Sequence, residues 1–198
     1  MVGNFKYKAF ISYSRRDKKI VDWFHKNLES YKTPSNISIE GKSIPKKVGN
    51  VFKDTDDLSS HHSLDGALKE ALDSSEYLLV FCSISSAKSK FVNEEINYFR
   101  DKYGEKNIIS IILDGEPNAT SNSQFSDSEE SFPLALRLDN NNSYNPLAVD
   151  IRKTKDSKQK ALIKVVANMF HIWFDDIWKR EKRRLFINRV IFSIISIL

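Results

Sequence analysis

A glutamate near the start of one predicted helix has the clearest position for chemistry in this chain of 198 residues. Apolar residues between Lys88 and Tyr103 recur at helical spacing, and at about 100° of rotation per residue they form one buried stripe. Glu94 falls opposite this stripe, whereas Glu95 falls about 70° from its centre, at the border between the buried face and water. A carboxylate at such a border is either a catalytic candidate or one half of an ordinary surface ion pair. The stripe consists of Val92, Ile96, Phe99 and Tyr103.

Histidine and cysteine side chains offer less for a site. His61 and His62 are adjacent in a polar loop, but neither a nearby cysteine nor a third ligand lies at suitable spacing, so we predict no metal site. His25 and His171 fall in predicted helices and are interpreted as packing or surface residues. The single cysteine, Cys82, lies inside an apolar run, which excludes an internal disulfide framework and a cysteine-based metal site.

Glu95 is positioned by the strand that precedes the predicted helix 88–103. Tyr77 to Cys82 are apolar at every residue, as in a central parallel strand that helices cover on both faces. Ligands of such sheets bind at the carboxyl ends of the strands. Glu95 lies in the early part of the following helix, close above this strand end, where a pocket would open.

Strands alternate with helices along the chain, which indicates an α/β domain. We expect a flavodoxin-like fold, with a parallel sheet of about five strands and helices on both faces. The polar run from 114 to 145 is interpreted as a long surface connection with at most a short helix, and Ser14 and Asp17 have the spacing of a capping box. The predicted strands are Tyr7 to Tyr13, Val48 to Phe52, Tyr77 to Cys82, Ile108 to Leu113 and Leu147 to Ile151, and the predicted helices are 15–31, 64–72, 88–103 and 158–173.

The sequence lacks the motifs of several well-known classes of protein with this topology. The chain has six glycines and contains neither a Gly-x-Gly-x-x-Gly fingerprint nor a Walker-type loop, which argues against Rossmann enzymes and P-loop NTPases. A phospho-receiver domain has the same topology, but Ser83 follows the strand that ends at Cys82, and no aspartate is present there to be phosphorylated. A flavodoxin-like redox or nucleotide-binding module also lacks a recognisable phosphate loop.

The excess of positive charge is confined to one segment. The formal net charge is +5, and residues 179–189 hold six basic residues and one acidic residue, which accounts for all of it. The rest of the chain holds 25 basic and 25 acidic residues. A body without net charge has no electrostatic footprint for DNA or RNA, so we predict no nucleic-acid partner. A basic cluster before apolar residues is typical of segments that lie at an anionic membrane surface.

The C-terminal end is apolar from Val190 to Leu198, but nine residues are too few for a bilayer, which takes about 20. We interpret this end as the start of a transmembrane helix in a longer gene product, or as a partial insertion anchored by Trp178, Phe186 and the arginines. The alternative is an amphipathic helix docked on its own domain or on a partner. We therefore predict a cytoplasmic domain over 1–175, and a basic juxtamembrane segment with the start of a membrane anchor over 176–198.

Three stretches resemble the Toll/interleukin-1 receptor (TIR) family, and the resemblance extends over residues 5–173. Residues 8–14 (KAFISYS) resemble the first TIR strand and the start of its AA loop, and residues 51–54 (VFKD) resemble the second strand and the BB loop. Residues 89–96 (SKFVNEEI) resemble the αC helix motif Ser-x-Trp-(Cys or Val)-x-x-Glu-(Leu or Ile). The glutamate of this motif is catalytic in TIR enzymes and corresponds to Glu95. Residues 147–152 also resemble bacterial TIR proteins in which a membrane anchor follows.

The resemblance implies an enzyme that cleaves the nicotinamide–ribose bond of NAD⁺, with NAD⁺ as substrate and no cofactor. It assigns the catalytic carboxylate to Glu95 and the substrate-binding wall to Tyr13, Ser14, Phe91 and Asp54, the last at the base of the BB loop. On the alternative interpretation, Tyr13 and Phe91 are core aromatics and Ser14 is a helix cap. Phe91 departs from the family pattern because the motif has tryptophan there, which carries an indole donor.

Self-association is also implied, since in TIR enzymes the BB loop of one domain closes over the site of its neighbour. A signal that clusters the anchored domains would then start NAD⁺ cleavage, as in bacterial antiphage defence, with ADP-ribose or a cyclised form as product. His61 and His62 stand where a small residue or glycine is often found in the BB loop, which affects assembly. The alternative is a catalytically inactive adaptor that acts through TIR–TIR contacts, which the change to Phe91 favours.

Overall fold

A parallel sheet of five strands is the centre of the computed structural model, which describes residues 5–34, 38–39, 42–54, 66–137, 147–152 and 157–195. The strand order is β4-β1-β5-β6-β7, so the first strand lies between the next two strands of this sheet along the chain. This is the flavodoxin-like order, and the predicted fold class is confirmed. The strands are β1 (Tyr7–Ser12), β4 (Val51–Lys53), β5 (Ser75–Cys82), β6 (Ile108–Ile112) and β7 (Leu147–Asp150), and a separate antiparallel pair consists of β2 (Ser38–Ile39) and β3 (Lys42–Ser43).

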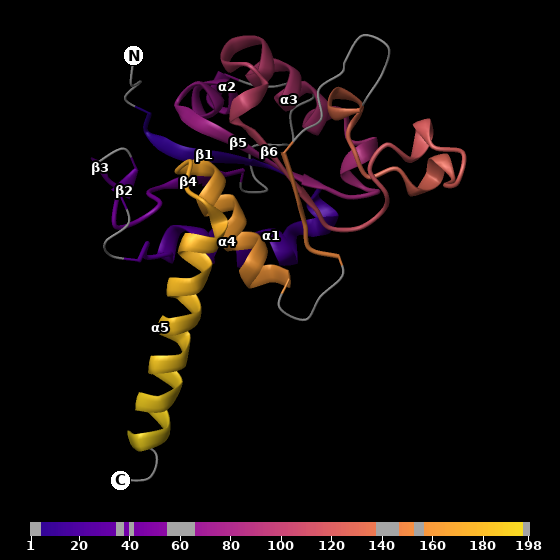
Figure 1. Ribbon diagram of the computed structural model, residues 1–198. Helices are drawn as coiled ribbons and strands as arrows, with labels where there is room; N and C mark the ends of the chain where they lie inside the picture. Colours follow the sequence, from indigo (N-terminus) through magenta and orange to yellow (C-terminus); the bar gives the residue numbers. More distant parts are fainter. Residues whose placement is uncertain are drawn as a thin grey trace.

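Helices cover both faces of this sheet (Figure 1). They are α1 (Lys18–Ser30) and α4 (Ser157–Met169) on one face, and α2 (Gly66–Asp73) and α3 (Lys90–Tyr103) on the other. Each central strand contributes alternate residues to the two cores, because successive side chains of a strand point to opposite faces. In β5, Leu79 and Phe81 pack on the side of α1 and α4, whereas Leu78 and Val80 pack on the side of α2 and α3.

The same alternation continues in β1 up to the edge of the sheet. Ala9 and Ile11 are buried on the side of α1 and α4, and Phe10 is buried on the side of α2 and α3. Ser12, the last residue of the strand, falls on the face of Phe10 and is 1% exposed. A polar side chain therefore lies in the core where the pattern of the strand would favour an apolar one.

The start of α1 differs from the sequence prediction. A short 3₁₀ helix, η1 (Arg15–Asp17), precedes α1, and the side chain of Ser14 makes no capping hydrogen bond to it. The carboxylate of Asp17 instead accepts a hydrogen bond of 2.7 Å from the hydroxyl of Ser83, which follows β5. The predicted capping box is wrong because this tertiary contact occupies the acidic side chain. The contact also ties η1 to the carboxyl end of the central strand.

The connection after β6 is more ordered than its polar composition indicated. As far as Arg137 it contains three 3₁₀ helices, η4 (Ala119–Ser121), η5 (Asp127–Glu129) and η6 (Leu134–Leu136). Glu130 is 3% exposed and accepts hydrogen bonds from the backbone N–H groups of Asn118, Thr120 and Phe132. The predicted surface connection holds for residues 120–129, which are exposed. It is wrong for Glu130 to Phe132, which are buried, because the Glu130 carboxylate satisfies backbone N–H groups inside the fold. Residues 138–145 lie outside the described residues.

The same connection is fixed to α3 through Ala135. The backbone N–H of Ala135 donates to the side-chain oxygen of Asn93 at 2.8 Å, and the carbonyl of Ala135 accepts from Nη1 of Arg100 at 2.7 Å. Phe132 and Leu136 join the core that α3 covers. The connection therefore holds α3 against the sheet at two polar contacts and one apolar contact surface.

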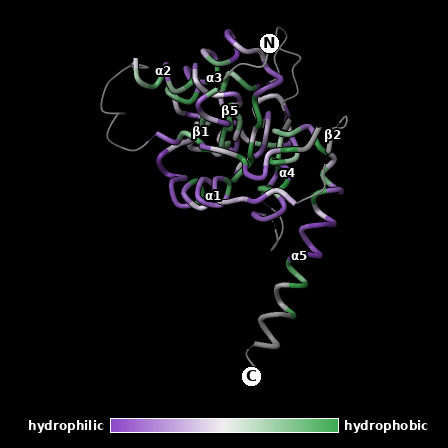
Figure 2. The backbone as a smooth tube through the Cα atoms, turned by 90° about the vertical axis from the view of Figure 1, so that its left-hand side faces the viewer, coloured by the Kyte–Doolittle hydropathy of each residue, from purple (hydrophilic) through white to green (hydrophobic). Residues whose placement is uncertain are grey.

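A fifth helix, α5 (Phe174–Ile195), packs on α4 at its start and then extends away from the body (Figures 1 and 2). Ile177 is fully buried in the core of α1 and α4. Glu181 is 1% exposed and accepts a hydrogen bond of 2.6 Å from Arg184, which also donates to the carbonyl of Lys32 at 3.0 Å. These contacts attach the first half of α5 to the end of α1.

The membrane anchor predicted at the C-terminus is wrong. Along the described part of the chain, no helix combines the length and the apolar character that crossing a bilayer requires. The 22 residues of α5 include a dense group of charged side chains between Asp175 and Arg184, and Arg189 follows. The apolar residues of α5 that follow these charges, Val190 to Ile195, are too few to cross a bilayer, and the predicted membrane location is withdrawn. The predicted division at 175 and 176 falls inside α5 and stays a prediction.

Gly115 allows a test of the connection after β6. Its φ is +68°, and an added Cβ would lie 2.6 Å from the carbonyl oxygen of Glu129 and 2.9 Å from Ile84. We expect Gly115→Ala to lower the free energy of unfolding by about 2 to 4 kcal/mol, because backbone strain and overpacking add. Urea denaturation measures this change.

Gly66→Ala is the matched control, since Gly66 begins α2 and an added Cβ there would meet no atom within 4 Å. We expect its free energy of unfolding to stay within about 1 kcal/mol of the parent or to rise slightly, because alanine is the better helix former. Equal destabilisation by the two substitutions would contradict the crowding inferred at Gly115.

Candidate active site

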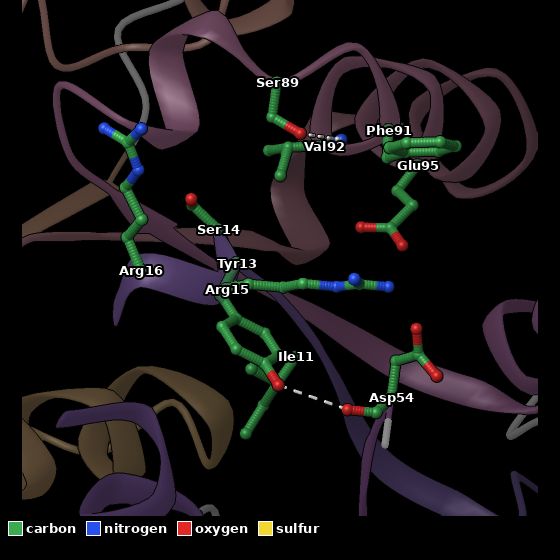
Figure 3. Close-up of a pocket in the computed structure, with 10 residues that line it drawn as sticks. All are labelled: Ile11, Tyr13, Ser14, Arg15, Arg16, Asp54, Ser89, Phe91, Val92 and Glu95. Atoms are coloured by element: carbon green, nitrogen blue, oxygen red, sulfur yellow. Dashed lines mark hydrogen bonds between the residues drawn. The ribbon is translucent and has the colours of Figure 1, made fainter. Parts of the chain in front are cut away.

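A pocket of about 380 Å³ opens at the carboxyl end of β1, beside the first turns of α3 (Figure 3). Its wall combines the residues that follow β1, the residue that follows β4, and one face of the N-terminal half of α3. This is the edge of the sheet at which flavodoxin-like folds bind ligands. The lining residues are Ile11, Tyr13, Ser14, Arg15, Arg16, Asp54, Ser89, Phe91, Val92 and Glu95.

All five residues that we predicted for the site line this pocket. Tyr13 and Ser14 come directly after β1, and Asp54 comes directly after β4, which pairs with β1. Phe91 and Glu95 lie one turn apart on α3. The structure thus brings together residues from three separate stretches of the chain. Their chemical roles stay predictions.

Ser89 sets the start and therefore the rotation of α3. It is the N-cap residue, and its hydroxyl accepts a hydrogen bond of 3.3 Å from the backbone N–H of Val92. From this start, Val92 and Ile96 point into the core, while the ring of Phe91 is 45% exposed at the mouth of the pocket. Glu95 is 8% exposed, so it lies deeper than the border position that its helical spacing indicated.

The carboxylate of Glu95 is buried and is held by one hydroxyl. Ser12 donates a hydrogen bond from its Oγ to Oε2 of Glu95, from β1 to α3. The pKa of Glu95 is raised from 4.5 to about 8, chiefly by burial; the charges of Asp54 and Glu94 also raise it, and the Ser12 hydrogen bond lowers it. Glu95 therefore exchanges its proton close to neutral pH.

Tyr13 joins the two strand ends that border the pocket. Its hydroxyl donates a hydrogen bond of 3.2 Å to the backbone carbonyl of Asp54, and its ring packs against the core of α1 and α4. Figure 3 shows this bond at the side of the pocket opposite Glu95. The contact fixes the point at which the chain leaves β4 relative to the end of β1.

Sequence reasoning missed three residues of this region. Arg15 and Arg16 line the pocket, and both are exposed. Figure 3 shows the side chain of Arg15 extending toward the carboxyl groups of Glu95 and Asp54, whereas Arg16 points away from them. Their position right after Ser14 at a strand end was the available signal, and we had interpreted it only as a helix start.

Ser12 is the third missed residue, and its signal was the alternation of β1. A period of two places Ser12 on the same face as Phe10, and the apolar stripe of residues 88–103 requires α3 to cover one face of the sheet. The alternation alone does not say which face of β1 meets α3. The partner of Glu95 therefore became visible only in the fold.

The arrangement suits a ligand that carries positive charge or that develops positive charge during a reaction. A carboxylate in a partly enclosed pocket interacts with such charge more strongly than it would in water. An exposed aromatic ring stands beside it for a flat group, and the guanidinium of Arg15 is available for an anionic one. In the portion that the structure describes, no group of three or more His, Cys, Asp or Glu residues is placed to hold a metal ion; His61 and His62 lie outside it.

This geometry defines a class of protein: a flavodoxin-like α/β domain with a recessed carboxylate at the carboxyl ends of its strands. A family model described as a TIR domain matches residues 9–162, and the chain belongs to this family. A bacterial relative, NAD(+) hydrolase ApTIR from Actinoplanes sp., is 27% identical over 112 residues. The matched segment is 56% of this chain but only 14% of the relative. The predicted TIR membership is confirmed.

The raised pKa of Glu95 has a consequence for stability. The folded carboxyl keeps its proton up to about pH 8, whereas the unfolded one loses it near 4.5, so stability from this group falls as the pH rises between these values. We expect Glu95→Gln to remove this fall. The difference in free energy of unfolding between Glu95→Gln and the parent should favour the variant more at pH 9 than at pH 5. We expect this change to be roughly 1 to 4 kcal/mol, since one pKa unit corresponds to about 1.4 kcal/mol.

Urea denaturation at pH 5 and pH 9 measures the difference. Glu94→Gln is the control, because Glu94 precedes Glu95 on α3, is exposed, and contributes the smallest of the effects that raise the pKa of Glu95. A pH-independent effect of Glu95→Gln would show that the carboxyl is ionised throughout this range, and would contradict the burial described above.

Proposed function

We propose that this chain cleaves the bond between nicotinamide and ribose in NAD⁺, with Glu95 as the catalytic carboxylate. The observation that supports this most is a buried carboxylate that faces a pocket at the ligand-binding edge of a TIR fold. The relative that is named an NAD(+) hydrolase supports the choice of substrate. On this proposal NAD⁺ is the substrate and no cofactor takes part.

The reaction needs charge stabilisation more than proton transfer. When the C1′–N bond of NAD⁺ breaks, its electron pair moves to the cationic pyridinium, and nicotinamide leaves as a neutral molecule. The ribose gains oxocarbenium-like positive charge, which a nearby carboxylate stabilises. Water then adds at C1′ and loses a proton, which gives ADP-ribose; attack by a ring nitrogen of the adenine would give a cyclic product instead.

Substrate binding would itself prepare Glu95 for this role. In the free protein the pKa of Glu95 is about 8, so at neutral pH most of the carboxyl is protonated. A cationic pyridinium in the pocket favours the ionised form, because an opposite charge within a few ångströms lowers the pKa of a carboxyl group. The carboxylate is therefore formed where the positive charge of the substrate lies.

The other lining residues would hold the rest of the dinucleotide. Phe91 offers an exposed aromatic face for a flat ring, as the family tryptophan would. Arg15 supplies positive charge in the same pocket for the diphosphate. Tyr13, Ser14 and Asp54 shape the wall on the side of the strands.

Self-association is part of the proposal. The loop that follows Asp54 would close over the site of a neighbouring domain, so that clustering controls cleavage. Residues 55–65 of this loop lie outside the described residues. An upstream signal that clusters the domains would then trigger NAD⁺ consumption, a role in bacterial defence signalling.

Glu95→Ala tests the catalytic role. We expect the full chain to release nicotinamide from NAD⁺, with a rate per molecule that rises with protein concentration, and Glu95→Ala to lower kcat/KM by at least about 100-fold. Chromatography of nicotinamide over time measures this. Glu94→Ala, one residue away on the exposed face of α3, should stay within about twofold of the parent.

Persistence of the activity in Glu95→Ala would remove Glu95 from the mechanism. Absence of nicotinamide release by the parent chain, even at the highest protein concentration, would favour the adaptor that acts only through TIR–TIR contacts.

Phe91 provides a separate test of the binding wall. We expect Phe91→Ala to raise KM for NAD⁺ about tenfold with a smaller change in kcat, since a lost stacking contact is worth about 1 to 1.5 kcal/mol. Phe91→Trp should keep KM or lower it. Steady-state kinetics of the two variants give the comparison. An unchanged KM in Phe91→Ala would place the ring outside the substrate contact.

A further inference from the structure

We propose that Ser12 is a positioning residue for Glu95: its buried hydroxyl holds one carboxylate oxygen from the sheet side and so directs the other oxygen at the ligand. This inference rests on the proposed function, because it assigns a partner to the carboxylate that carries it. Ser12 does not line the pocket and is 1% exposed, so it is not offered as a catalytic residue.

The contact joins two elements that the fold holds rigidly. Ser12 ends β1, which is paired with strands on both sides, and Glu95 lies in the second turn of α3, whose stripe packs on the sheet. The Oγ of Ser12 donates to Oε2 of Glu95, and among the described residues no other hydrogen bond to this carboxylate is formed. The orientation of the carboxylate therefore depends on this hydroxyl.

The geometry leaves Oε1 as the oxygen that meets a ligand. Figure 3 shows the carboxyl group of Glu95 directed into the pocket, toward the space between α3 and Asp54. Oε2 is held by Ser12, whose side chain does not line the pocket. A hydroxyl that donates to a carboxylate binds its ionised form more strongly than its protonated form. Ser12 thus fixes the direction of Glu95 and favours the charge that the reaction uses.

The charged and titratable groups around this contact come from each neighbouring element. Asp54 follows β4 and Glu94 lies on α3, and both disfavour a further negative charge at Glu95. Arg15, from η1, and Tyr13 line the same pocket. Ser12 differs from all of them because it is uncharged at every pH used, so its removal changes the field of fixed charges little.

Ser12→Ala and Ser110→Ala make a matched pair for the test. Both serines are buried on strands, and both belong by alternation to the face of the sheet that α2 and α3 cover. Ser110 lies on β6, separated from β1 by β5, and forms no hydrogen bond with Glu95. Each substitution removes one buried hydroxyl with almost no change in volume, but only the hydroxyl of Ser12 is hydrogen-bonded to Glu95. A general effect of removing a buried hydroxyl therefore appears in both variants, and an effect of the Glu95 contact appears only in Ser12→Ala.

The experiment follows kcat/KM for nicotinamide release by the full chain from pH 6 to pH 10. We expect Ser12→Ala to move the rising limb of the profile to higher pH by about one unit, with a loss of about tenfold at pH 7 that shrinks toward pH 10. Ser12→Thr, which restores a hydroxyl, should recover the parent profile in part, and Ser110→Ala should keep it. An unmoved limb in Ser12→Ala would overturn the inference.

A second measurement keeps this inference separable from the proposed function. The carboxyl carbon of Glu95 can be titrated by NMR with ¹³C-labelled glutamate, assigned by its loss in Glu95→Gln, without any turnover. A higher midpoint in Ser12→Ala than in the parent and in Ser110→Ala supports the contact, even if NAD⁺ is not cleaved. Loss of activity in Glu95→Ala together with an equal midpoint in all three proteins leaves the function standing and removes the role of Ser12.

Discussion

The carboxylate of Glu95 is kept out of water at the junction of β1 and α3, and the elements around it are arranged to allow this. A buried carboxyl requires a polar partner, and Ser12 provides it from a strand position where an apolar residue would pack more favourably. It also requires a defined helix rotation, which the Ser89 cap and the packing of Val92 and Ile96 on the sheet provide. One charged group thus accounts for features of both secondary structure elements.

The pocket around this carboxylate combines charges of opposite sign with an exposed aromatic ring. Asp54 and Glu94 raise the pKa of Glu95, while the guanidinium of Arg15 extends toward the same space. Such a site discriminates by charge distribution: a ligand with a cationic ring near Glu95 and anionic groups near Arg15 complements it, and a uniformly anionic ligand does not. On the proposed function, binding and ionisation would be coupled, because a cationic ring beside Glu95 lowers the pKa of its carboxyl group.

Much of this architecture follows from the sequence. The alternation of strands with helices predicts the parallel sheet of five strands, and helical spacing alone separates Glu95 from Glu94. A family resemblance gave Tyr13, Ser14, Asp54 and Phe91. The first three meet because β1 and β4 are neighbours, and Phe91 joins them from α3. What the sequence did not reveal depends on contacts between distant residues. Ser83 takes the carboxylate of Asp17, Ser12 meets a residue 83 positions away, and Glu130 folds a polar stretch inward.

The polar stretch after β6 bears on how sequences of this kind diverge. Its described residues do not line the pocket. The backbone of Ala135 is nevertheless hydrogen-bonded to Asn93 and Arg100 on α3, the helix that carries Glu95. Substitutions on the solvent side of η4 and η5 are therefore expected to leave the site unchanged. A change in length between Glu130 and Ala135 would instead shift α3, which carries Glu95. Sequence change in this stretch is thus constrained in spacing and at Glu130, and is less constrained at the exposed positions of η4 and η5.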